Sequence, residues 1–95
     1  MPVVKWTLPA RDDLRAISEW LEREASPEFA VRTLATIRLR SKFLKDFPRG
    51  GRPYRDETRL LRVLDTPYLI RYRILAGVVQ VLRVHHERED WFVEP

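Results

Sequence analysis

Arginine and histidine side chains crowd together near the end of the chain. Arg83, His85, His86 and Arg88 lie within six positions, and both histidines of the chain are among them. A guanidinium group binds phosphate through paired donors, whereas an imidazole can accept or release a proton near neutral pH. This set could therefore bind a nucleic acid and cleave RNA through its own 2′-hydroxyl, because that reaction needs only a base, an acid and cations for the charged transition state.

The same residues also have ordinary structural explanations. A histidine at a strand end is often a hydrogen-bonded structural residue, and arginines on an exposed sheet face protect the sheet from aggregation. His85 and His86 are adjacent and should point to opposite faces of a strand, and the sequence shows no third ligand, so we expect no metal site. No motif indicates a cofactor. The absence of cysteine excludes disulfide bonds and thiolate chemistry.

The stretch 67–88 is predicted to form two antiparallel strands joined by a tight turn at Ala76–Gly77. Alternation along the second strand assigns Leu82 and Val84 to the core, with His86 near the strand end. The same alternation assigns Val81 to the open face.

Several cations are expected to share that open face. Arg83 and His85 alternate with the core residues of the last strand, and Arg88 lies just beyond them. Arg71 and Arg73 share one face of the preceding strand, and Arg62 comes from the strand before it. If these faces coincide, the arginines gather on one surface that could bind a polyanion.

The rest of the chain must provide the layer behind this sheet. Residues 3–8 are predicted as a short strand, and apolar residues at helical spacing predict one helix from about Pro9 or Ala10 and a second over 27–46. Ser26 should cap the second helix and Pro27 should occupy its first position. The loop 47–53 ends the helical region. The apolar stretch Asp90–Val93 should fold back onto the protein or pair with a partner.

The order of these elements predicts an α+β fold. An N-terminal strand and an αα-hairpin should pack on one face of a small antiparallel sheet, in the order β-α-α-β-β-β, within a single domain of residues 1–95. No apolar run is long enough to cross a membrane and no secretory signal is visible, which favours a cytoplasmic location.

Positive charge is concentrated in the middle of the chain. Residues 38–62 contain nine Lys or Arg and three Asp or Glu, a net charge of +6, whereas the whole chain carries +4. Such a segment attracts a polyanion or an acidic protein, although a solvated basic surface without a specific ligand is also possible.

Four stretches of this sequence resemble the RelE/ParE superfamily of type II toxins. They are the WTxxARDDLxxI opening, the GGRPYR loop, the PYLIRYRI strand and the final VLRVHHERED. The resemblance covers nearly the whole chain. It implies a toxin that is neutralised by a cognate antitoxin. This antitoxin is expected to be ParD-like, to wrap an extended segment around the toxin and to carry a DNA-binding module.

The superfamily has two main activities, and the resemblance helps to choose between them for this chain. RelE-like toxins cleave mRNA in the ribosomal A site, and that activity would use Arg62, Arg83, His85, His86 and Arg88 here. Their catalytic arginine at the start of the PYLIRYRI strand corresponds to Leu69, and their C-terminal tyrosine has only Trp91 or Phe92 in its place. ParE-like toxins instead poison DNA gyrase. The resemblance therefore favours the ParE-like branch, in which the target would be bound by Arg71, Arg73, Arg83 and Arg88.

Two further expectations concern partners. The antitoxin is expected to dock beside the two helices, because Phe29, Val31 and Phe43 widen the apolar stripe of the second helix, and Trp91 offers a further apolar contact. The alternative is that these side chains belong to the core. A third functional reading is a catalytically inert, antitoxin-binding relic.

Overall fold

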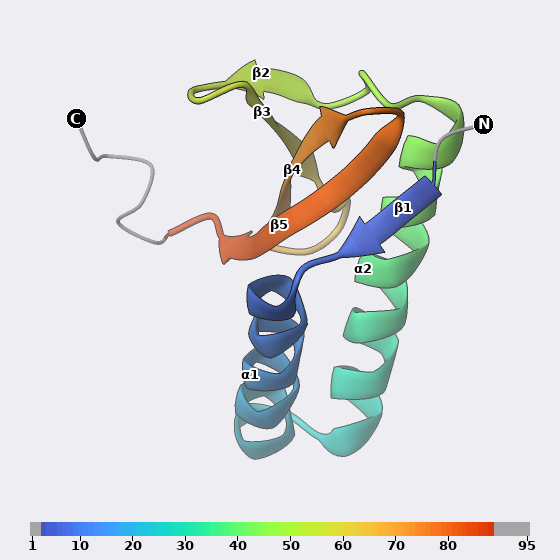
Figure 1. The fold of residues 1–95 in the computed structure, drawn as a ribbon. Helices are drawn as coiled ribbons and strands as arrows, with labels where there is room; N and C mark the ends of the chain where they lie inside the picture. Colours follow the sequence, from blue (N-terminus) through green and yellow to red (C-terminus); the bar gives the residue numbers. More distant parts are fainter. Residues whose placement is uncertain (1–2, 89–95) are drawn as a thin grey trace.

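Two antiparallel helices pack against one face of a five-stranded sheet in the computed structural model, which describes residues 3–88 (Figure 1). Strand β1 (Val3–Trp6) leads into helices α1 (Leu8–Glu24) and α2 (Pro27–Asp46). Strands β2 (Arg52–Tyr54), β3 (Thr58–Arg62), β4 (Tyr68–Leu75) and β5 (Val78–His86) follow. The predicted α+β fold is confirmed. Neither helix is long and apolar enough to span a membrane.

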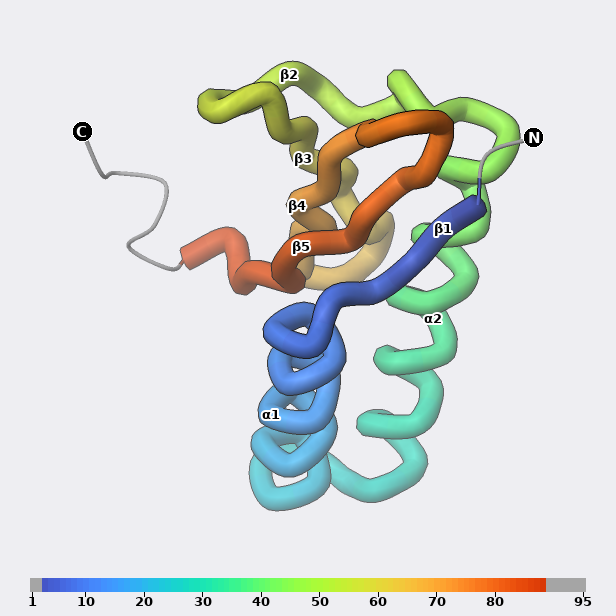
Figure 2. Tube along the Cα trace, viewed as in Figure 1, coloured from blue at the N-terminus to red at the C-terminus, as the bar shows by residue number. Residues whose placement is uncertain are grey.

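The strand order in the sheet is β1-β5-β4-β3-β2. Strands β2 to β5 pair antiparallel, as predicted for β3 to β5, but β1 pairs with β5 in parallel, so that the complete sheet is mixed. The trace shows the first strand lying directly beside the last one (Figure 2). Strand β2 was not predicted; it arises where the residues after Gly51 pair with β3.

Capping residues set where the two helices begin. The Oγ1 atom of Thr7 accepts a hydrogen bond from the Ala10 backbone N–H at 3.2 Å, so α1 starts slightly earlier than the apolar spacing predicts. The Ser26 hydroxyl oxygen accepts from the Phe29 N–H at 3.0 Å, and Pro27 occupies the first turn of α2. The predicted cap and break between the helices are therefore confirmed.

A β-bulge in β5 corrects the predicted alternation. Arg71 lies opposite Arg83, but the next residue of β4, Tyr72, lies opposite Val81, so Leu82 is an extra residue in β5. As a result, Val81 and Val84 both face the helices and are buried, whereas Leu82 is only partly buried. The assignments of Val81 to the open face and of Leu82 to the core were wrong, because the bulge shifts the alternation by one residue.

The core lies between the helices and this sheet face. Its members come from both layers and pack as one cluster that includes Ala10, Leu14, Ile37, Leu44, Leu61, Val63, Tyr68, Ile70, Tyr72, Val79, Val81 and Val84. The hairpin turn that joins β4 to β5 has positive φ at both Ala76 and Gly77, as a two-residue turn requires.

Tyr72 joins the core to the loop that follows α2. Its hydroxyl donates a hydrogen bond to the Pro48 carbonyl and accepts one from the Gly51 N–H, both at 2.8 Å. Burial raises the pKa of Tyr72 above its usual value of 10.0, whereas the Gly51 N–H and the charge of Arg59 act in the opposite direction.

The raised pKa of Tyr72 makes stability depend on pH in the alkaline range. The unfolded chain loses the phenolic proton near pH 10, before the folded protein does, so the stabilisation is complete below pH 10 and is lost as pH rises further. Urea unfolding from pH 8 to 11 should show this decline. The decline should be shallower in Tyr72→Phe, with the remainder due to Tyr68, whose pKa is also raised by burial. An identical slope in both proteins would contradict the assignment.

Candidate functional site

The sheet face turned away from the helices carries the predicted cationic residues. In the strand register, Leu69 lies between Arg62 of β3 and His85 of β5, and Arg71 lies opposite Arg83. This surface, which we call the basic face, therefore brings together Arg62, Arg71, Arg73 and Arg83. Sequence alternation placed these four arginines together correctly.

Arg83 is held by a residue that the sequence did not single out. Its Nε and Nη2 atoms donate to the two carboxylate oxygens of Asp13, at 2.7 and 2.9 Å. Oδ2 of Asp13 also accepts from the Val84 backbone N–H at 2.9 Å. Thr7, at the start of the same helix, donates through Oγ1 to the Leu82 carbonyl. These hydrogen bonds connect the start of helix α1 to the bulge of β5.

Arg71 and Arg73 are also positioned by neighbours. The Nε atom of Arg71 lies 3.4 Å from the Thr58 hydroxyl, and its guanidinium lies 5.5 Å from the centre of the Tyr54 ring. The contact from Arg71 to the Asp56 carboxylate is longer, at 4.0 Å. The Nε atom of Arg73 donates to the Gln80 side chain at 2.7 Å. These contacts keep both guanidinium groups spread over the basic face.

Arg62 marks the other end of this face. It forms an exposed ion pair with Glu87 at 3.3 Å, and its carbonyl accepts a hydrogen bond from Arg40 of α2 at 2.8 Å. An exposed pair of this kind contributes little stability and can be exchanged for a ligand. The Arg62 guanidinium has one exposed contact, whereas that of Arg83 makes two hydrogen bonds to Asp13. Arg62 is therefore more readily available to an anion.

The two histidines lie on opposite faces of the sheet, as predicted. His85 shares the basic face with Leu69, but it is only 4% exposed and Leu69 only 6%. His86 lies on the helix side, where its ring meets Tyr68 edge-on at 5.5 Å and its Nδ1 atom accepts from the N–H of Arg88. The five residues named for the nuclease alternative are thus divided between two surfaces, and His85 is the histidine that shares a face with Arg62 and Arg83. Within residues 3–88, no three potential ligands come together to hold a metal.

The residues predicted to contact the antitoxin differ in their exposure. Phe29 and Val31 on α2 are 42% and 67% exposed, as a docking surface requires. Phe43 instead packs against the core, stacks on Phe47 at 4.9 Å and lies under Arg40. Trp91 lies outside the described residues.

A groove beside the helical hairpin is lined by aromatic residues, among them Trp20, which the sequence did not single out. It has a volume of about 540 Å³ and lies between the two helices and the loop from β3 to β4. The groove is lined by Trp20, Phe29, Thr33, Leu64, Tyr68 and His86, among others. Trp20 is 51% exposed although it lies on an amphipathic helix. The spacing of apolar residues in the sequence did not indicate this exposure.

The helical hairpin, the sheet and its basic face define a class of protein, the RelE/ParE superfamily of type II toxins. A sequence model described as the ParE toxin of the type II toxin–antitoxin system parDE matches residues 4–91. The chain belongs to this ParE toxin family.

Three similar proteins carry RelE or ParE names. Toxin RelE2 of Caulobacter vibrioides is 34% identical over 86 residues, which cover 90% of this chain and 96% of that protein. A chain of the chromosomal ParDE system of P. aeruginosa superposes with a TM-score of 0.86 and 28% identity, over 90% of this chain and 96% of that one. A chain of the RelBE2 toxin–antitoxin complex of Mycobacterium tuberculosis gives a TM-score of 0.67 and 27% identity, over 93% of each chain.

Proposed function

We propose that this toxin is ParE-like: it inhibits DNA gyrase and is neutralised by a cognate antitoxin. The observation that carries the proposal is Leu69. It occupies the position where the nuclease branch has a catalytic arginine, and it is buried on the basic face opposite His85. An aliphatic side chain there can neither bind phosphate nor transfer a proton.

Two further observations support the ParE-like reading. Arg83 is hydrogen-bonded to Asp13, and His86 lies on the helix side of the sheet, away from Arg62 and Arg83, so not all of the residues named for the nuclease alternative can act on one bond. The structural similarity to the ParDE chain, with a TM-score of 0.86, is also higher than that to the RelBE2 chain, at 0.67.

Supercoiling of plasmid DNA by purified gyrase tests this proposal directly. We expect added toxin to block supercoiling or to accumulate cleaved DNA, and to leave ribosome-bound mRNA intact. An Arg71→Glu variant should lose most of this inhibition because it reverses a charge in the middle of the basic face. Undiminished supercoiling together with cleavage of ribosome-bound mRNA would refute the gyrase assignment.

The second candidate is a ribosome-dependent mRNA endonuclease of the RelE type. It is favoured by the gathering of Arg62, Arg71 and Arg83 around His85 and by the similarity to Toxin RelE2. Under this reading, Arg83→Ala abolishes toxicity while the protein stays folded. Its thermal unfolding must be measured in parallel, because Arg83 also binds Asp13.

Neutralisation by an antitoxin is supported by the two solved structures, both of which belong to toxin–antitoxin systems. Co-expression of the protein encoded by the adjacent gene should restore growth to cells that produce this toxin. Growth arrest that the neighbouring protein does not relieve would contradict the antitoxin assignment. Normal growth on expression of the toxin alone would indicate the inert relic.

A further inference from the structure

The groove between the helical hairpin and the loop from β3 to β4, which we call the aromatic groove, has two chemically different ends. At one end, Trp20 and Phe29 are exposed, and the Arg32 guanidinium lies 5.8 Å from the centre of the Phe29 ring. At the other end, the loop contributes Leu64, which is 57% exposed, and Asp65. Each end therefore combines exposed apolar surface with one charge, and the two charges have opposite signs.

These two charges are not neutralised by each other or by their neighbours. Neither Arg32 nor Asp65 forms an ion pair within residues 3–88. Both residues are exposed, so that a partner could reach them without rearrangement of the fold. The groove therefore offers one cation and one anion, at opposite ends, to whatever covers its apolar surface.

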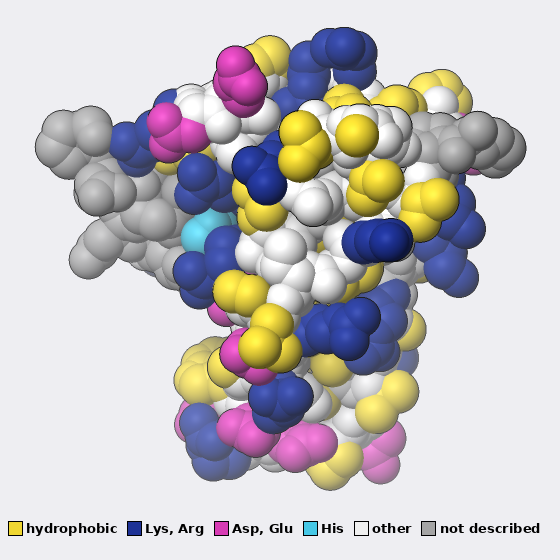
Figure 3. Space-filling view, in the orientation of Figure 1, with side chains coloured by type: hydrophobic (Ala, Val, Ile, Leu, Met, Phe, Trp, Pro, Cys, Tyr) yellow, Lys and Arg dark blue, Asp and Glu magenta, His cyan; other side chains and the backbone are white. Residues whose placement is uncertain are grey.

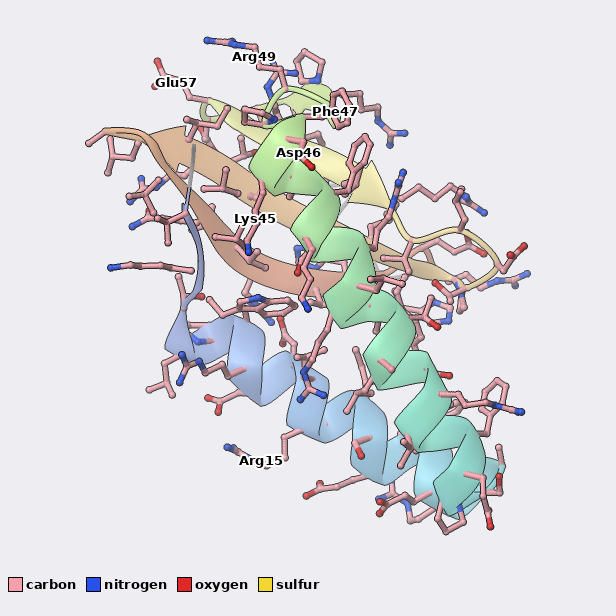
Figure 4. The ribbon with its side chains drawn as sticks, turned by 90° about the vertical axis from the view of Figure 1, so that its right-hand side faces the viewer. Arg15, Lys45, Asp46, Phe47, Arg49 and Glu57 are labelled. Carbon is pink, nitrogen blue, oxygen red and sulfur yellow. The ribbon has the colours of Figure 1, made fainter. Side chains whose placement is uncertain are left out.

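The aromatic groove carries no net charge, although the chain carries +4. Arg32 and Asp65 are the only Lys, Arg, Asp or Glu among the described residues that line it. Elsewhere cations prevail: Figure 3 shows Lys and Arg side chains spread over the sheet and the helices on one face of the molecule. Arg15 and Lys45 project on the side of the hairpin that carries β1, whereas the loop from β3 to β4 lies on the other side of α2 (Figure 4). Two positively charged copies of this chain repel each other least where their surfaces are neutral.

We infer that the aromatic groove is the contact surface of a symmetric dimer of this chain. A two-fold axis requires that one surface supplies both partners of every contact. With the two grooves facing each other, the Leu64 end of one copy meets the Trp20 end of the other, so that exposed apolar side chains of both copies leave the solvent. The same arrangement brings Asp65 of each copy to Arg32 of the other, which forms two equivalent ion pairs.

A second copy matches this groove better than a strongly charged ligand does. A polyanion would be attracted by Arg32 but repelled by Asp65, and a cationic segment would meet the reverse. Both charges are matched by a surface with one charge of each sign at the same separation, which a second copy has because it is identical. The inference does not depend on whether the target is gyrase or the ribosome. Phe29 is also a predicted antitoxin contact, so the antitoxin would compete with this dimer.

Sedimentation equilibrium of the purified toxin without antitoxin tests the dimer. A contact built on a few apolar side chains per copy is small, so we expect a dissociation constant of roughly 10 µM. Leu64→Glu should weaken the dimer at least about tenfold, because it places a carboxylate against an apolar surface at both equivalent contacts. The control Leu75→Glu makes the same change at a leucine that is 52% exposed at the end of β4, outside the groove. It should dimerise within about twofold of the wild type.

Charge reversal tests the two-fold arrangement itself. Arg32→Glu and Asp65→Lys should each weaken self-association about tenfold, because each change brings like charges together at both equivalent contacts. An equimolar mixture of these two variants should dimerise again within about threefold of the wild type. In the mixed dimer, the new carboxylate of one variant meets the new ammonium group of the other, and the unchanged Arg32 and Asp65 form the second pair.

Three results would overturn the inference. A wild type that stays monomeric at about 100 µM would leave the groove to another occupant, such as the antitoxin. Equal weakening by Leu75→Glu would indicate a dimer through a different surface, and a mixture that does not associate again would exclude the paired charges. Circular dichroism and thermal unfolding should show that all four variants keep the fold, which their exposed positions allow. If the positive φ of 65° at Asp65 makes Asp65→Lys unfold, the comparison of Leu64→Glu with Leu75→Glu still decides.

Discussion

Replacing Asp13 with alanine is expected to lower the free energy of unfolding by about 2 kcal/mol. The carboxylate accepts hydrogen bonds from Arg83 and from the Val84 backbone N–H, and its side chain is only 16% exposed. The Arg83 side chain is 48% exposed, so the ion pair itself contributes modestly. The larger loss comes from the Val84 N–H, which is left without its acceptor beside the bulge. Urea unfolding at neutral pH measures the change.

Two partial substitutions show which contact matters. Asp13→Asn keeps an oxygen that can accept from Val84, and Arg83→Gln removes the charge but leaves the Asp13–Val84 hydrogen bond in place. Each should therefore lose about half as much stability as Asp13→Ala, or less. If Arg83→Gln destabilises the protein as strongly as Asp13→Ala, the guanidinium and not the backbone bond holds α1 to the bulge. Arg83→Ala is then also a poor test of function, because it would disturb the fold.

Gly51→Ala is expected to be the most damaging of the single-methyl additions, at about 3 kcal/mol. A Cβ atom at this position would lie 2.7 Å from the Leu60 carbonyl oxygen and 2.8 Å from the Tyr72 ring and hydroxyl. The carbonyl belongs to β3 and cannot move without disturbing the sheet, and Tyr72 is fully buried. The change should also weaken the hydrogen bond from Gly51 to Tyr72.

Gly77→Ala is the matched control for this prediction. Nothing lies within 4 Å of a Cβ atom at Gly77, so only its positive φ of 76° penalises alanine, by about 1 kcal/mol. In the double variant Gly51→Ala/Tyr72→Phe, removal of the hydroxyl eliminates one of the close contacts, and the combined loss should be smaller than the sum of the two single losses. Thermal unfolding of the wild type and of the four variants, Tyr72→Phe included, tests this order, and equal losses for Gly51→Ala and Gly77→Ala would contradict it.

Local signals account for the parts of the fold that sequence reasoning predicted correctly. Ser26 and Pro27 define the break between the helices, and the Ala76–Gly77 turn defines the hairpin, because each acts on its immediate neighbours. The parallel pairing of β1 with β5 depends on residues more than seventy positions apart. No local pattern encodes such a pairing, so the mixed sheet could not be predicted.

The candidate site was predictable to the same extent. Alternation along β4 correctly placed Arg71 and Arg73 on one face of the sheet. Past the bulge, alternation failed for Val81, and nothing in the local sequence indicated that Asp13 would bind Arg83 from a helix. Apolar spacing also did not separate Phe43, which packs on the core, from the exposed Phe29.

The pairing of β1 with β5 also constrains when the protein can become active. Residues 3–6 find their partners only at 78–81, and Val79, Val81 and Val84 complete the core from the last strand. At a synthesis rate of about 10 residues per second, the first strand and the helices exist for several seconds before the last strand is made and the core can close. Native contacts of such large sequence separation also form slowly. A nascent chain therefore cannot complete this fold, and the finished core first forms when the last strand has left the ribosome.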